Sequence, residues 1–279
     1  MLPVLATDTV TGDLARAVGY TLLWGLEGVA LRSVGGERVP FVNEAAVRRR
    51  LAADDLPVAA VDPGLFEGSA ERRAVWMNDV VAFEDTASFC RRVGCGVVRV
   101  GALGTGGDMS ARVEALRALG TAAARHGLRL AVRNEAGTAV ATGADLGALL
   151  AAVGLANVGA DWHPAEACRA GDEPLAGLDA LLAQATVTCV AAVDEAPADD
   201  GVLVDVPVGE GRLEWAAQLA RLARAGFDGP LVLAVPGRPA GAAGMASAAA
   251  LVRLARGAVR EARGAAPAEA RGSSRPATR

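Results

Sequence analysis

The sequence predicts an α/β fold in which eight strands and eight helices alternate and close into a single (β/α)8 barrel. Apolar runs of strand length alternate with Ala-, Leu- and Arg-rich helical stretches along the whole chain, which is typical of βα units around a parallel sheet. The length of 279 residues suits one such domain, since these barrels commonly occupy about 250 residues. An open doubly wound sheet is the alternative, but eight evenly spaced units favour closure.

The expected strands are short and aliphatic, and aromatic residues make up only 4% of the chain, which argues against a sandwich built on large rings. Pro63-Gly64 closes the third strand. In chain order the strands are Leu2–Ala6, Gly28–Ser33, Pro57–Asp62, Val97–Val100, Leu128–Glu135, the first part of Asn157–Glu166, Thr186–Asp194 and Pro230–Val235.

The expected helices lie between these strands. Asn43 followed by Glu44 suits an N-cap with an acidic first turn, and Gly94 suits a helix C-terminus. The helices are Thr11–Trp24, Asn43–Ala53, Ser69 or Ala70 to Val93, Asp108–His126, Gly143–Val153, Leu175–Gln184, Leu213–Ala225 and a last one within Gly241–Arg263. Glu195–Gly211 is expected to be a long polar loop. Residues 1–263 form the predicted barrel domain, and residues 264–279, which lack a periodic apolar face, are predicted to be a disordered tail.

The stretch Asn157–Glu166 has the features of a strand that ends at a site. Asp161 and His163 are one residue apart, so both side chains point to the same side of a strand, and Pro164 prevents further ladder pairing. Sites of parallel α/β proteins lie at the carboxyl ends of the strands. The alternative is a helix that begins at Pro164, with Asp161 or His163 as its cap.

Composition limits the partners and the compartment. The net charge of −4 and the lack of a basic face argue against nucleic acid. Four cysteines without a CxxC pair indicate reduced thiols. No leader and no apolar run of roughly 18 residues are evident, so we expect a cytoplasmic protein with no membrane contact. A homo-oligomer is compatible with the sequence.

Several ordered motifs resemble one known family. They are G-V-A-L-R at Gly28–Arg32, P-G-L-F at Pro63–Phe66, L-A-V-R-N-E at Leu130–Glu135, Asn157–Pro164, Leu175–Leu182, G-E-G-R-L-E-W at Gly209–Trp215 and F-D-G-P-L-V-L at Phe227–Leu233. Together they resemble the xylose-isomerase-like TIM barrels, a group that includes sugar-phosphate isomerases and epimerases, inosose dehydratases and hydroxypyruvate isomerases.

The resemblance implies a divalent metal held by Glu, Asp, His and Glu on strands five to eight. Arg133, Ala191 and Ala234 stand at three of these positions, and His163 stands at the fourth unless the strand slips by two and Asp161 takes it. A hard divalent ion needs several converging oxygen ligands, and Arg133 adds positive charge. We therefore expect no metal and no other cofactor, although a mouth loop could supply Asp62 or Asp108.

The charged residues at the strand ends have two interpretations. Arg133 and Arg99 could anchor an anionic ligand, or they could form internal ion pairs, for Arg133 with Glu135, Asp161 or Asp194. His163 with Asp161 or Glu135 could form an acid-base group. Further candidate ligand contacts are Glu67, Asp194 and Trp162, the last of which could equally be core.

Two functions follow. The first is a binding barrel for a small hydroxylated, anionic molecule, which is a sugar, a polyol or a hydroxy acid with or without phosphate, with metal-dependent isomerisation lost. The second is a metal-independent isomerase, epimerase or lyase that uses the His163 group. The sequence leaves open whether Asp161 or Glu135 is the carboxylate partner of His163.

Overall fold

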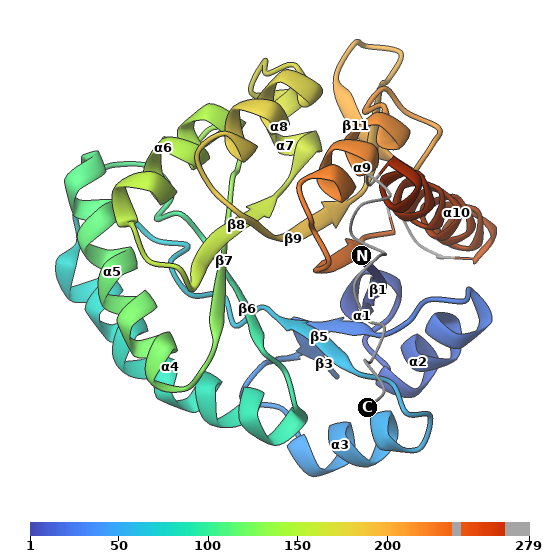
Figure 1. Cartoon of the computed structure of the whole chain (residues 1–279). Coiled ribbons are helices and arrows are strands. Elements are labelled where there is room, and N and C mark those ends of the chain that lie inside the picture. The colour runs from blue at the N-terminus through green and yellow to red at the C-terminus, as the bar shows by residue number, and fades with distance from the viewer. Residues whose placement is uncertain (236–240, 266–279) are drawn as a thin grey trace, which may run out of the picture.

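Eight parallel strands close into one barrel, as predicted (Figure 1). The computed structural model describes residues 1–235 and 241–265. Around the barrel the order is β1-β12-β9-β8-β7-β6-β5-β2. The strands are β1 (Leu2–Ala6), β2 (Val29–Leu31), β5 (Val58–Val61), β6 (Val97–Val100), β7 (Arg129–Arg133), β8 (Val158–Trp162), β9 (Val187–Ala192) and β12 (Pro230–Leu233).

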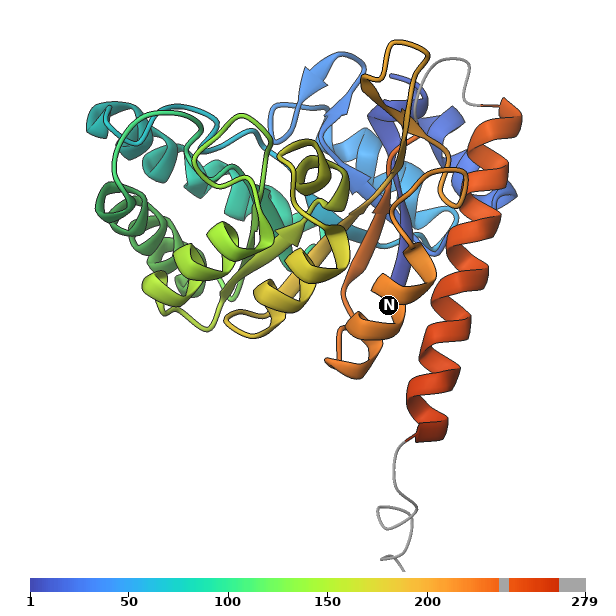
Figure 2. The same cartoon turned by 90° about the horizontal axis from the view of Figure 1, so that it is seen from above.

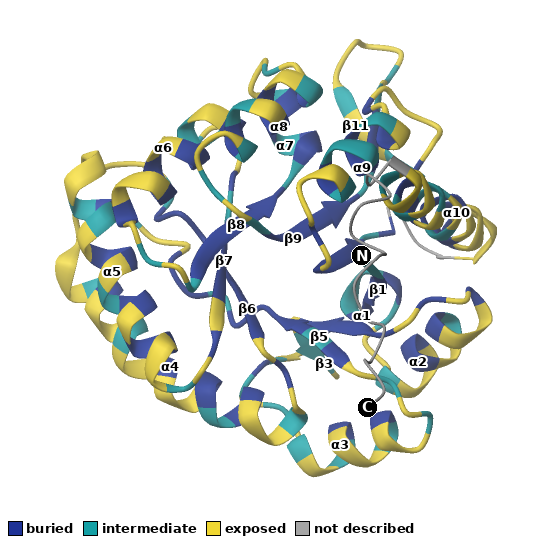
Figure 3. Cartoon of the chain, viewed as in Figure 1, coloured by how far each residue is buried: buried dark blue, intermediate teal, exposed yellow. Residues whose placement is uncertain are grey.

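The helices surround the barrel with one buried face each (Figures 1 and 3). They are α1 (Thr7–Val10), α2 (Leu14–Leu23), α3 (Glu44–Ala52), α4 (Arg73–Val93), α5 (Met109–Arg125), α6 (Gly143–Val153), α7 (Pro164–Arg169), α8 (Pro174–Leu182), α9 (Trp215–Arg224) and α10 (Gly241–Ala265). Asn43 caps α3 through Ala46 N, and Gly94 ends α4 at a φ of 72°, both as expected.

Some element boundaries differ from the prediction. The first predicted helix begins at Leu14 instead of Thr11, because the Asp13 carboxylate caps α2 by accepting from the backbone N–H groups of Ala15 and Arg16, and the short helix α1, which was not predicted, precedes it. Helix α4 begins later than Ser69 or Ala70. For Asn157–Glu166 both interpretations hold in part: β8 ends at Trp162, and α7 begins at Pro164 without a side-chain cap.

Two antiparallel hairpins project from the same end of the barrel (Figure 2). The first joins β3 (Ser33–Val34) to β4 (Glu37–Arg38), and the second joins β10 (Asp194–Pro197) to β11 (Leu203–Val206). The expected polar loop over Glu195–Gly211 was therefore wrong for its first half. A turn at Gly201, which has a φ of 80°, lets the two arms pair.

The barrel interior is filled by small side chains. One apolar cluster inside the barrel comprises Val4, Ala6, Ala30, Ala60, Val97, Ala131, Cys189 and Val232, and a larger cluster lies between strands and helices. Strand alternation places Arg99, Arg133 and Ala191 two residues beyond Val97, Ala131 and Cys189, so they follow the interior cluster toward the carboxyl-terminal end. The small interior leaves room for the long arginine side chains above it.

Helix α10 is the last barrel helix and packs against α9 and β1. Among the described residues its span Gly241–Gly264 is the one helix long and apolar enough to cross a membrane by length and composition, a test that the core helix of a soluble protein also passes. The helix continues to Ala265, two residues past the predicted domain end, and the rest of the predicted tail lies outside the described residues.

Candidate functional site

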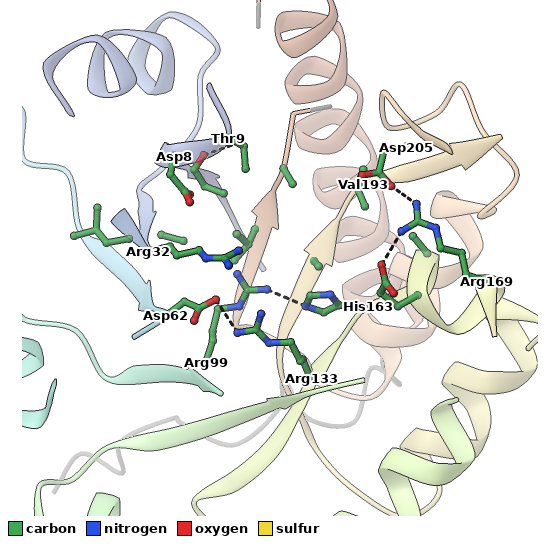
Figure 4. A pocket seen from close by; sticks show the side chains of 18 residues that line it. Asp8, Thr9, Arg32, Asp62, Arg99, Arg133, His163, Arg169, Val193 and Asp205 are labelled. Carbon is green, nitrogen blue, oxygen red and sulfur yellow. Dashed lines mark hydrogen bonds and ion pairs between the residues drawn. The ribbon is translucent and has the colours of Figure 1, made fainter. Parts of the chain in front are cut away.

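A cavity of about 210 Å³ opens at the carboxyl-terminal end of the barrel (Figure 4). Most of its walls come from the last residue of a strand or the first residues after it, which is where this architecture places sites. The lining residues are Ala6, Asp8, Thr9, Ala30, Leu31, Arg32, Asp62, Arg99, Arg133, His163, Ala165, Glu166, Arg169, Ala191, Val193, Asp205, Val232 and Ala234.

A group of hydrogen-bonded side chains joins Arg99 on β6 to Asp161 on β8 and to His163, which directly follows β8. Arg99 Nε donates to Asp161 Oδ2 at 2.8 Å, and the side chains are 10% and 0% exposed. Burial alone would raise the pKa of Asp161, but attraction by the Arg99 guanidinium and by His163 outweighs it and holds the pKa far below its usual range. Asp161 is therefore a carboxylate at any physiological pH.

His163 Nε2 faces two partners with opposite requirements. It lies 2.9 Å from Arg99 Nη2 and 3.1 Å from Asp161 Oδ2. A guanidinium only donates, so the first contact needs a bare Nε2, whereas a carboxylate only accepts, so the second needs a proton there. One protonation state cannot satisfy both contacts. A ligand that accepts from Arg99 Nη2 would release Nε2 from the first requirement.

The backbone of His163 is held by Asn134, the residue after β7. The Asn134 side chain accepts from His163 N at 2.9 Å and donates to His163 O at 3.0 Å. It also donates to Ala141 O at 3.1 Å, and the side chain is buried. These bonds fix the start of α7 relative to β7.

Arg133 forms an ion pair with Asp62 from the end of β5. Arg133 Nη2 donates to Asp62 Oδ2 at 2.7 Å, and Arg38 Nη2 approaches Asp62 Oδ1 at 3.4 Å. Burial would raise the pKa of Asp62, but Arg133, Arg99 and Arg32 together lower it. The Nε of Arg133 is buried with no hydrogen-bond partner. The internal ion pair is therefore present, but the expected partners Glu135, Asp161 and Asp194 were wrong.

Arg169 on α7 closes the opposite rim. It donates to Glu166 Oε1 at 2.6 Å, lies 3.3 Å from the buried Glu195 Oε2, and contacts Asp205 on β11. These pairs tie the β10–β11 hairpin to α7. Figure 4 shows this group apart from the Arg99–His163 side of the cavity.

The structure brings together four of the eight predicted site residues. Arg99, Arg133 and His163 line the cavity, and Asp161 lies against two of them. Glu67 is half-exposed and pairs with Arg38 at 2.8 Å outside the lining. Glu135, in the exposed turn after β7, does not line the cavity.

The remaining two predicted residues have structural contacts. Asp194 is buried and accepts from the backbone N–H groups of Glu195, Gly209 and Leu213, which holds the second hairpin. Trp162 points outward from the barrel, and its Nε1 donates to Gln218 Oε1 at 3.0 Å. Neither lines the cavity.

Sequence reasoning did not assign Asp8, Arg32, Glu166, Arg169 or Asp205 to the site. Arg32 carried a signal, because it directly follows the second strand. Arg169 and Asp205 carried none, since their approach to the mouth depends on a helix at Pro164, which was only the alternative interpretation, and on a hairpin that was not predicted.

The cavity does not provide a donor set for a divalent ion. Among the described residues there is no group of three or more His, Cys, Asp or Glu side chains that could hold a metal. Asp161 and Asp62 are each paired with an arginine, and Ala191 and Ala234 offer no side-chain donor. The carboxylates of Asp161 and Asp62 are therefore each compensated by a guanidinium group, which disfavours a cation beside them.

Comparison with known proteins agrees with this fold. The sequence model of the family described as xylose isomerase-like TIM barrel matches residues 20–255. No curated protein is significantly similar in sequence.

Similar solved structures include L-ribulose 3-epimerase, with 14% identity, TM-score 0.74 and coverage of 96% of this chain and 98% of that one. The IOLI protein with a bound zinc atom has 15% identity and TM-score 0.75, over 94% of this chain and 99% of that one. A xylose isomerase-like TIM barrel protein from Mycobacterium smegmatis in complex with magnesium has 14% identity and TM-score 0.71, over 89% of each chain. At these identities the likeness shows the fold alone.

Proposed function

Because the chain belongs to the xylose isomerase-like TIM barrel family, we propose that its barrel mouth binds a small hydroxylated anion through side chains alone, without a divalent metal. The observation that carries the proposal is that Arg99 and Arg133 line the cavity, while the described residues contain no group of three or more His, Cys, Asp or Glu side chains that could hold a metal. A guanidinium can bind a carboxylate or phosphate directly with two donors, a role that a metal would otherwise take.

Arg133 is the proposed charge anchor. Among the described residues only Asp62 forms a hydrogen bond with its side chain, through Nη2, and Arg133 lies in register with Asp161 on the neighbouring strand. Arg99 is less available, because Asp161 and His163 already engage two of its nitrogens. His163 is 17% exposed and can donate to or accept from a ligand hydroxyl.

Substitution of Arg133 by Met tests the anchor. It keeps most of the apolar bulk and removes the donors, so it should weaken an anionic ligand by about 1.5–3 kcal/mol. Arg129→Met is the matched control, since Arg129 begins the same strand at the opposite, exposed end.

The measurement is isothermal calorimetry with glycolate, lactate, glycerate, gluconate and glycolate 2-phosphate, each with and without EDTA. We expect EDTA-insensitive binding that Arg133→Met weakens and Arg129→Met leaves unchanged. Binding that requires added Mn²⁺, absence of binding by every anion, or an unchanged affinity in Arg133→Met would contradict the proposal.

The 3.1 Å contact between Asp161 and His163 favours a second candidate, a metal-independent isomerase, epimerase or lyase. In it His163 is the proton carrier, and Asp161, which stays ionised, orients it. Chelator-treated protein in D2O should then incorporate deuterium beside the carbonyl of a keto sugar, and His163→Gln should abolish this. Unchanged deuterium incorporation in His163→Gln would refute this candidate.

A further inference from the structure

The cavity wall is divided into two arcs of different chemistry. Strands β5 to β8 are consecutive around the barrel and contribute Asp62, Arg99, Arg133 and, just after β8, His163. Strands β9, β12, β1 and β2 form the other consecutive arc. Their contributions on the strand or directly after it are apolar except for Arg32, which directly follows β2; the apolar ones are Ala191, Val193, Val232, Ala234, Ala6, Ala30 and Leu31.

The apolar arc is small and open to the cavity. Ala191 and Ala234 line the cavity and belong to neither apolar cluster. Ala6, Ala30 and Val232 also line it and join the interior cluster beneath. Each alanine presents only a methyl group, so the side chains of this arc occupy little space.

Backbone groups of the apolar arc are already used in the barrel. Ala30, Ala191 and Val232 lie within paired ladders, and Ala234 N donates to Ala192 O at 3.2 Å. A ligand hydroxyl placed there would lose water without gaining a side-chain partner, which is unfavourable. Polar residues border this arc on its β1 and β2 side: Asp8 and Thr9 lie in α1 after β1, and Arg32 directly follows β2 and extends into the cavity (Figure 4).

From this division we infer that the ligand is amphipathic: a carboxylate with a neighbouring hydroxyl that faces β5 to β8, and a compact apolar body that faces β9, β12 and β1. The inference rests on the proposed function, since it specifies the substrate class of the same site. A polyhydroxylated acid of equal size has the same carboxylate and neighbouring hydroxyl, but its remaining carbons carry hydroxyl groups that do not suit the apolar arc.

Calorimetry with two series of 2-hydroxy acids tests this. Glycolate, lactate and 2-hydroxyisovalerate share one head and grow an apolar body, whereas glycerate and gluconate grow a hydroxylated one. We expect about fourfold tighter binding for each carbon added in the apolar series, the value for burying one methylene. The hydroxylated series should show no such gain.

A matched pair of variants tests whether the apolar arc causes this difference in affinity between the two series. Ala191→Val and Ala191→Thr add side chains of nearly equal volume that differ by a methyl against a hydroxyl group. The ratio of affinities for 2-hydroxyisovalerate and glycerate should be about tenfold lower in Ala191→Thr than in Ala191→Val. If either variant fails to fold, the same pair at Ala234 serves, since Ala234 lies in the same arc.

The outcomes separate this inference from the function on which it rests. Glycerate or gluconate binding as tightly as 2-hydroxyisovalerate, with Arg133→Met weakening all of them, would overturn the amphipathic ligand and leave the anion site standing. Equal affinity ratios in the two Ala191 variants would also overturn it. Absence of binding by both series would overturn the inference together with the proposed function.

Discussion

Asp161→Asn should be the most destabilising conservative substitution at the barrel mouth. The substitution removes the negative partner of the Arg99 guanidinium, and the Arg99 side chain is only 10% exposed. The charged contact that is lost, between Arg99 Nε and Asp161 Oδ2, is 2.8 Å long. With charge centres about 4 Å apart and an effective dielectric constant of about 20, the lost attraction is about 4 kcal/mol. Removal of one partner from a buried pair typically costs about 3–5 kcal/mol, so we expect a loss in this range.

Urea unfolding followed by circular dichroism measures the loss. Asp179→Asn is the control, because Asp179 pairs with Arg221 at 2.8 Å but is 55% exposed. Such surface pairs contribute about 0–1 kcal/mol. The double variant Arg99→Met with Asp161→Asn should lose less than Asp161→Asn alone, since no unpaired guanidinium stays buried.

The same residue gives a pH dependence with a definite sign. The folded-state pKa of Asp161 is lowered, so its stabilisation is complete above the unfolded pKa of about 3.9 and is lost as pH falls below it. Wild-type protein should therefore lose stability more steeply than Asp161→Asn in acid. A loss below about 1 kcal/mol in Asp161→Asn, or a double variant less stable than the single one, would refute the reasoning.

Two further predictions concern the metal and the tail. Elemental analysis of protein purified without chelator should show substoichiometric Mn, Zn and Mg, because Ala191 and Ala234 offer no donor and Arg133 repels cations. One equivalent of metal bound at the mouth would contradict this prediction. Truncation after Ala265 should leave the melting temperature unchanged, since the sequence beyond lacks a periodic apolar face, and a large fall would show that the tail packs on the barrel.

The fold was predictable because each βα unit carries its own local signal. Short apolar runs, glycine at helix ends and the Asn43 cap define the units without knowledge of distant contacts. The β10–β11 hairpin was missed because the Asp194 carboxylate holds it by accepting hydrogen bonds from the backbone N–H groups of Gly209 and Leu213, which lie beyond the hairpin in the chain. The turn residues by themselves resemble those of a loop.

The site was predictable only as far as strand alternation reaches. Asp161 and His163 share a side because they are two residues apart, and they do meet. The partner of Arg133 depends instead on the register between distant strands, which brings Asp62 within 2.7 Å over a separation of 71 residues. Trp162 points outward and Arg133 inward because successive side chains of a strand alternate between its two faces. Which of the two faces lies inside is decided by the closure of the whole barrel.

The clamp formed by Asn134 has a consequence for selectivity. Asn134 directly follows Arg133 in the chain and holds both main-chain polar groups of His163, so a shift of one strand end carries the other with it. In the proposed binding mode Arg133 and His163 therefore meet the ligand at a constant separation that is set when the chain folds, so little conformational entropy should be lost on binding. Anions should be distinguished by the spacing of their acceptor atoms rather than by adjustment of the protein to each one.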